Sequence, residues 1–102
     1  MTKAVLISPE QQSIEPMELS DQNDIKRLIG FDTIESEALG GAGDQLFFDE
    51  ECFIRGSSGR FQIDRLIPVS GRGVVVGIAA DGKLTDVSIG IEELRGRTQF
   101  QN

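Results

Sequence analysis

The stretch SGRGVVVG (residues 70–77) decides the fold, because it opens the most apolar and most β-prone run of the chain. Valines occupy positions 74–76, and three consecutive β-branched residues favour a strand and disfavour a helix. We therefore predict a central strand over residues 73–80, entered through turn glycines. Within it, Gly77 predicts a bulge or a close approach by a helix.

The glycines at 71, 73 and 77 also suggest a loop that wraps nucleotide phosphates. In a dinucleotide-binding fold, such glycines follow a strand and open a helix, whose N-terminus meets the pyrophosphate. Here the glycines precede a strand, the G-x-G-x-x-G spacing is absent, and no Gly-Lys-Ser/Thr follows. A nucleotide-binding loop of either type is therefore not predicted.

Other apolar runs predict strands that pair with the central one. Residues 3–8 (KAVLIS) and 13–19 (SIEPMEL) predict a hairpin around PEQQ, with Pro16 at an edge or a bulge. Asp81-Gly82 is a strong hairpin turn, after which residues 83–89 (KLTDVSI) are expected to return as a partner strand.

Residues 21–29 predict the principal helix. Ser20 is a suitable N-cap, acidic residues fill the first turn, basic residues fill the last turn, and Gly30 can end the helix. Its one-sided apolar stripe predicts packing on a sheet.

The middle of the chain is less clear. Residues 31–39 (FDTIESEAL) predict a strand with Glu35 and Glu37 on its solvent face, followed by a glycine-rich turn at 40–44. Residues 45–54 (QLFFDEECFI) allow either two strand segments around an Asp-Glu-Glu turn or one strand with a bulge. Residues 61–69 predict a short extended or helical piece closed by Pro68.

The sum is a single α+β domain over residues 1–102, with a mostly antiparallel sheet of about five to seven short strands and one helix across it. A helical turn is expected at Ile91–Arg95, and residues 97–102 are expected to fray.

Composition excludes several kinds of chemistry. The chain has no histidine and one cysteine, Cys52, in an apolar context that predicts burial. Histidine-dependent triads and histidine-based metal sites are therefore ruled out, and we predict no catalytic residues, no metal and no cofactor. Without a signal peptide or a membrane-spanning run, a cytoplasmic protein is expected.

Charge is unevenly distributed. Residues 1–51 hold 12 of the 17 acidic residues and three of the 10 basic ones, whereas residues 52–102 hold five acidic and seven basic residues. The acidic half would repel a phosphate backbone, which disfavours nucleic acid as a partner. It also permits two weaker hypotheses: a DNA mimic, and a homodimer that pairs the acidic half with the basic one.

One candidate site binds a small anion. Arginines in or beside Gly/Ser loops can join backbone N–H groups around a phosphate, provided that the loops at 55–60 and 70–73 lie at the same end of the sheet. The residues concerned are Arg55, Ser57, Ser58, Arg60, Gly71, Arg72 and Gly73. The alternative is that these arginines, with Arg65, are solvated or paired with the acidic half.

A second candidate is acidic. Asp44 and the run Asp49-Glu50-Glu51 supply oxygen ligands of the kind that Ca²⁺ or Mg²⁺ prefers, but the order of an EF-hand loop is missing. A solvated turn is the favoured interpretation.

The chain resembles a family of short proteins from bacteria, plasmids and phages that is known only as a domain of unknown function. The resemblance lies in Ile7-Ser8-Pro9, Leu28-Ile29-Gly30, Asp49-Glu50, Phe61 with Pro68, and the glycines at 71, 73 and 77. It implies an accessory protein of a mobile element and supplies no catalytic residues.

The first hypothesis is therefore a non-enzymatic interaction module that acts through a protein partner. The second is a binder of an anionic, nucleotide-like ligand. The third is an enzyme that uses carboxylates.

Overall fold

The predicted central strand is present as β7 (Gly73–Ile78). The computed structural model describes residues 1–40, 43–55 and 59–101, apart from the side chains of Phe53 and Arg55. Val74, Val75 and Val76 are all 0 % exposed, so both faces of β7 are covered. Each face of β7 therefore has to be covered by apolar side chains from other helices and strands.

β7 lies inside a six-stranded antiparallel sheet with the order β2-β1-β7-β4-β3, and β8 pairs with the end of β7. The predicted hairpin of residues 3–8 and 13–19 is confirmed as the first two strands. The other strands of this sheet are β1 (Thr2–Ser8), β2 (Ser13–Leu19), β3 (Ile34–Ala38), β4 (Asp44–Asp49) and β8 (Leu84–Thr85).

One face of the sheet is covered by α1 (Asn23–Ile29), which packs Ile25 and Ile29 against Val74 and Val76. Gly30 ends the helix as predicted, with φ of 94° and its N–H donating to the Lys26 carbonyl at 2.7 Å.

The start of α1 differs from the prediction. Ser20 is not the N-cap, because its backbone N–H and its hydroxyl both donate to the Asp24 carboxylate, at 2.6 and 2.9 Å. Asp21 accepts the Asn23 N–H at 2.8 Å instead, so the helix begins two residues later than expected.

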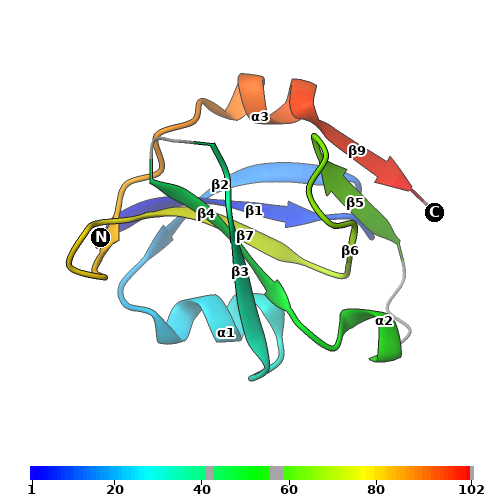
Figure 1. Ribbon diagram of the computed structural model, residues 1–102, viewed down its shortest axis with the longest axis horizontal. Helices are drawn as coiled ribbons and strands as arrows, with labels where there is room; N and C mark the ends of the chain where they lie inside the picture. Colours follow the sequence, from blue (N-terminus) through cyan, green and yellow to red (C-terminus); the bar gives the residue numbers. More distant parts are fainter. Residues whose placement is uncertain (41–42, 56–58, 102) are drawn as a thin grey trace.

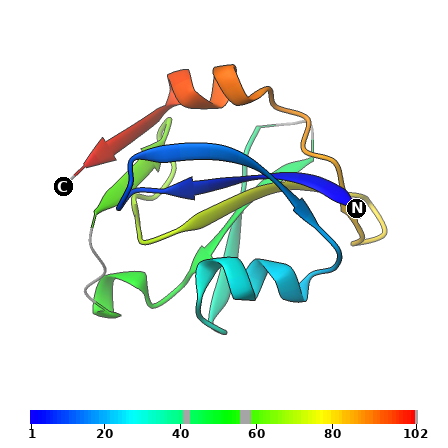
Figure 2. The ribbon, with the colours of Figure 1, turned by 180° about the vertical axis from the view of Figure 1, so that it is seen from behind.

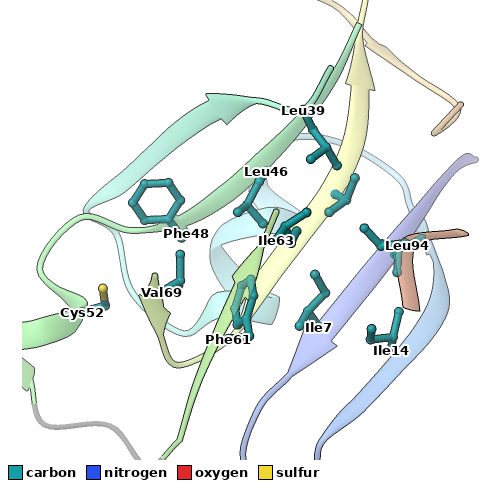
Figure 3. Close-up of a cluster of buried hydrophobic side chains, with 12 residues drawn as sticks. Ile7, Ile14, Leu39, Leu46, Phe48, Cys52, Phe61, Ile63, Val69 and Leu94 are labelled. Atoms are coloured by element: carbon teal, nitrogen blue, oxygen red, sulfur yellow. The ribbon is translucent and has the colours of Figure 1, made fainter. Parts of the chain in front are cut away.

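The opposite face is covered by a second sheet, with the order β6-β5-β9, and by α3 (Ile91–Arg97). Figures 1 and 2 show α1 on one side of the main sheet, and α3 with β9 on the other. Figure 3 shows the side chains of Phe61 and Ile63 from β5 and Leu94 from α3 in this second core, with Ile7 and Leu46 of the main sheet. The strands of the second sheet are β5 (Arg60–Ile63), β6 (Val69–Ser70) and β9 (Thr98–Gln101).

The α+β fold is confirmed, and its radius of gyration of 12.3 Å is that of one compact domain. The described residues form nine strands in two sheets rather than five to seven in one. The expected fraying is wrong for residues 98–101: they pair with β5, and Phe100 packs on the core.

Two other segments differ from the prediction. Residues 45–54 form neither two strands nor a bulged strand, because β4 is followed by a turn and the short helix α2 (Cys52–Arg55), in which Cys52 is buried as expected. The strand expected over 83–89 is limited to Leu84–Thr85, since the Val87 N–H turns to the Lys3 carbonyl of β1, at 2.9 Å.

Two glycines of β7 are needed for close packing. A Cβ on Gly77 would lie 2.4 Å from the Thr85 hydroxyl, so the close approach is by β8 and not by a helix. A Cβ on Gly73 would lie 2.6 Å from Cζ of Phe61 and 3.0 Å from Cδ1 of Leu46. Gly73 therefore lets the second sheet reach the first.

Gly73→Ala is expected to lower the free energy of unfolding by about 1–3 kcal/mol, because the added methyl overlaps a buried ring. Gly96→Ala in α3 is the matched control: nothing lies within 4 Å of its Cβ position, and alanine favours a helix by about 0.5–1 kcal/mol. Urea unfolding measures both. Equal stabilities for the two variants would contradict this account of the sheet packing.

Candidate functional site

The anion-site hypothesis required the loops at 55–60 and 70–73 to meet, and their described parts do. Arg60 of β5 pairs with Ser70 of β6, and the Gly71 N–H donates to the Gly59 carbonyl at 3.4 Å. Arg60 is exposed and Gly71 has φ of 92°. The side chain of Arg55, and Ser57 and Ser58 entirely, lie outside the described residues.

Arg72 does not join this group. Its guanidinium donates to the Leu28 carbonyl of α1 at 3.3 Å, on the helical side of the main sheet. Gly73 is buried against Phe61. The described residues of the hypothesis therefore divide between two places.

Two of the acidic candidates are structural. Asp44 is buried, and its two carboxylate oxygens accept the N–H groups of Ser88 and Ile89, each at 2.8 Å. Asp49 is buried as well and accepts the Thr33 hydroxyl and the Glu51 N–H. The interpretation as a solvated turn is therefore wrong for these two, which hold neighbouring segments in place.

Two kinds of feature are absent from the described residues. Over 1–40, 43–55 and 59–101, no three acidic or cysteine side chains gather as a metal site would require. No helix in these ranges has the length and apolarity to cross a membrane.

The two edge strands of the main sheet differ in their accessibility. On β1, the Lys3 N–H donates to the Asp86 carboxylate, and the Lys3 carbonyl accepts the Val87 N–H. The backbone groups of Lys3 therefore point away from β2. Glu18 is directly opposite Lys3, so this pair is not hydrogen-bonded and the backbone groups of Glu18 point to the outer side of β2. The same holds for every second residue of the strand, namely Pro16 and Ile14.

This outer edge of β2 is obstructed at two positions. Pro16 has no N–H to offer. The Arg95 guanidinium of α3 donates to the Ile14 carbonyl at 3.0 Å. A further strand could not pair regularly with β2.

The outer edge of β3 is open. The bonds from the Leu39 N–H to Asp44 and from the Glu50 N–H to Thr33 show that odd-numbered residues of this segment face β4. Ser36 and Ala38 therefore point their N–H and carbonyl groups away from the sheet, and no other strand of the described chain pairs there. The strand order β2-β1-β7-β4-β3 places β3 at the margin of the main sheet.

A hollow of about 260 Å³ lies beside this edge, between α1 and the strands β3 and β4. Ile25, Ile34 and Phe47 supply its apolar lining, Gln22 and Asn23 supply polar lining, and the exposed Lys26 lies on its rim. Ser36 is directly opposite Phe47 in the β3–β4 ladder, so the open backbone groups and the hollow are adjacent.

The other face of β3 is acidic. Glu35 and Glu37 are paired with Phe48 and Leu46, are exposed as predicted, and have no cationic partner among the described residues. A carboxyl hydrogen bond between Glu50 and Glu35 raises the pKa of Glu50, and burial and the charges of neighbouring acids add to the shift.

β9 also ends a sheet. It is four residues long, and the Thr98 hydroxyl bonds back to the Leu94 carbonyl of α3. No residue of β9 lines the hollow between α1, β3 and β4, which lies at the β3 edge. We therefore take the β3 edge site, made of Ile34–Ala38 with the hollow below α1, as the candidate functional site.

The sequence analysis placed Glu35 and Glu37 in solvent but did not identify β3 as an edge. The signal available was the composition IESEA, which is short, acidic and small, followed by glycines. Edge strands of natural proteins often have these properties.

Comparisons with known protein families, with curated proteins and with solved structures gave no match.

Glu50→Gln is expected to raise the stability at pH 7, because the amide removes one charge and can donate to Glu35. A carboxyl whose folded-state pKa is raised stabilises the fold below its unfolded pKa, and this contribution is lost as the pH rises through the folded value. The gain over the native protein should therefore vanish as the pH falls to about 4.

Urea unfolding between pH 4 and pH 8 measures this difference. Glu10→Gln, an exposed position in the turn after β1, is the control and should change stability little at any pH. A gain from Glu50→Gln that is constant with pH would contradict the Glu35–Glu50 coupling.

Proposed function

We propose that this protein is a non-enzymatic interaction module that binds an extended segment of a protein partner along the open edge of β3. The observation that carries the proposal is the contrast between the two sheet edges. β2 is obstructed by Pro16 and Arg95, whereas Ser36 and Ala38 of β3 offer regular backbone donors and acceptors.

Addition of a strand to a sheet edge is an established mode of peptide recognition. Backbone hydrogen bonds supply the affinity, and the pockets beside the strand select side chains. At β3, the hollow lined by Ile25, Ile34 and Phe47 is placed to accept a side chain of the added strand.

The absence of histidine and the burial of Cys52 support a binding role over catalysis. The resemblance to mobile-element proteins supports an accessory role, in which the protein acts in the cytoplasm of a cell that carries the element. The anionic-ligand alternative has less support, because Arg72 donates to the Leu28 carbonyl rather than joining Arg60.

Ser36→Pro tests the proposal, because proline removes an outward N–H and leaves the bonds to β4 in place. Peptides selected from a random library on the native protein should shift the amide NMR signals of β3. Their affinity for Ser36→Pro should fall about tenfold or more, through the lost bond and the steric conflict of the ring.

Ser36→Val keeps the N–H and is the matched control, which should bind like the native protein. Circular dichroism and urea unfolding establish that both variants are folded. The proposal fails if the selection yields no peptide that contacts β3, or if Ser36→Pro binds the selected peptides as well as Ser36→Val does.

A further inference from the structure

The two faces of the β3 edge site differ chemically, and side chains of an added strand alternate between the same two faces. Positions beside Ser36 and Ala38 project toward α1. Positions beside Glu35 and Glu37 project toward the opposite face. Each face therefore selects every second residue of the partner.

On the α1 face, the part of the hollow lined by Ile25, Ile34 and Phe47 favours apolar side chains. Ile25 is buried, and Ile34 and Phe47 are partly exposed, so a side chain that enters the hollow covers apolar surface. Lys26 on the rim disfavours a second cation there, whereas Ser36 and Ala38 are small enough to leave room for the incoming side chains.

On the opposite face, Glu35 and Glu37 are two residues apart and both exposed. Opposite charges in directly paired positions of a sheet stabilise the pair, and like charges destabilise it. Lysine or arginine at alternate positions of the added strand would therefore match this face.

We infer that the β3 edge site binds an extended peptide segment in which basic residues alternate with apolar residues, an inference that rests on the proposed function of β3. The basic residues lie beside Glu35 and Glu37. The apolar residues point toward Ile34 and Phe47, into the hollow between α1 and the strands β3 and β4.

The cluster of carboxyls beside this site supports a cationic partner. The side-chain hydrogen bond to Glu35, partial desolvation and the charges of Glu35, Glu51 and Asp49 all raise the pKa of Glu50, which shows that negative charge is crowded beside β3. A lysine or arginine beside Glu35 would offset the repulsion among these carboxylates.

A second copy of the chain fits this edge less well. Pairing two β3 strands would bring Glu35 and Glu37 of each copy against the same residues of the other, and like charges across a ladder repel. The homodimer suggested by the charge asymmetry is therefore a distinct outcome of the test.

The test uses three synthetic peptides of equal length: alternating valine and lysine, the same residues in two blocks, and alternating valine and glutamate. Fluorescence anisotropy measures their binding to the native protein at low and at physiological salt. The alternating valine–lysine peptide should bind at least about tenfold more tightly than either of the others. The ratio of its affinity to that of the valine–glutamate peptide should decrease as the salt concentration rises.

The charge-reversed variant Glu35→Lys/Glu37→Lys should lose this preference and favour the valine–glutamate peptide. The matched control, Glu15→Lys/Glu18→Lys, makes the same change of net charge on exposed positions of β2 and should bind like the native protein. Equal effects of the two double variants would show attraction to net charge alone and would overturn the inference.

The two levels of the proposal fail differently. If library-selected peptides lose affinity for Ser36→Pro but respond to neither charge reversal nor alternation, β3 binds a partner and the inferred chemistry is wrong. If no peptide responds to Ser36→Pro, the proposed function itself is wrong. If light scattering shows a dimer that Ser36→Pro converts to a monomer, the occupant is a second copy and the inference is overturned.

Discussion

Burial of β7 on both of its faces is the constraint on which the rest of the structure depends. Val74 and Val76 require a cover on one side, which α1 supplies, and Val75 requires a cover on the other, which the second sheet and α3 supply. The second sheet can approach β7 closely because β7 has no side chain at Gly73, where Phe61 packs. A strand buried on both faces is typical of the centre of a sheet, and its neighbours extend from it to two edges.

The two edge strands carry unpaired backbone groups, which can pair with a strand of another chain. The two edges differ in how far these groups are accessible. At β2, the chain removes a donor with Pro16 and covers a carbonyl with Arg95. At β3, it leaves the backbone groups of Ser36 and Ala38 accessible and places acids on one face. Glu35 and Glu37 would repel the same residues of a second copy. In the inferred complex they also attract a basic partner, so the same two residues disfavour self-association and favour peptide binding.

Much of this fold could be predicted from local sequence. The valine triplet indicated the central strand, Gly30 indicated the end of α1, and the first hairpin followed from its apolar runs and turn. What could not be predicted depends on contacts distant in sequence. β9 forms because β5 offers it an edge, and Asp44 is buried because Ser88 and Ile89 bring their N–H groups to it.

The candidate site illustrates the same limit. The sequence predicted that Glu35 and Glu37 face solvent, but Ser36 and Ala38 are exposed as well. The reason is that β3 lies at an edge, and an edge is a property of the sheet order, which no single segment contains. The hollow below α1 likewise needs residues from three elements, since Ile25, Ile34 and Phe47 come together only in the folded chain. Pro16 predicted an edge, but the edge that it marks is the obstructed one, β2.

Amide hydrogen exchange of the free protein tests most directly whether the edge of β3 is open. Glu35 and Glu37 donate toward β4, whereas Ser36 and Ala38 donate toward solvent, so alternate amides of one strand should differ in exchange rate. The account predicts fast exchange at Ser36 and Ala38, and slow exchange at Glu35, Glu37 and the valines of β7. Protection of Ser36 and Ala38 equal to that of Glu35 and Glu37 would show that this edge is already occupied, and would contradict the account.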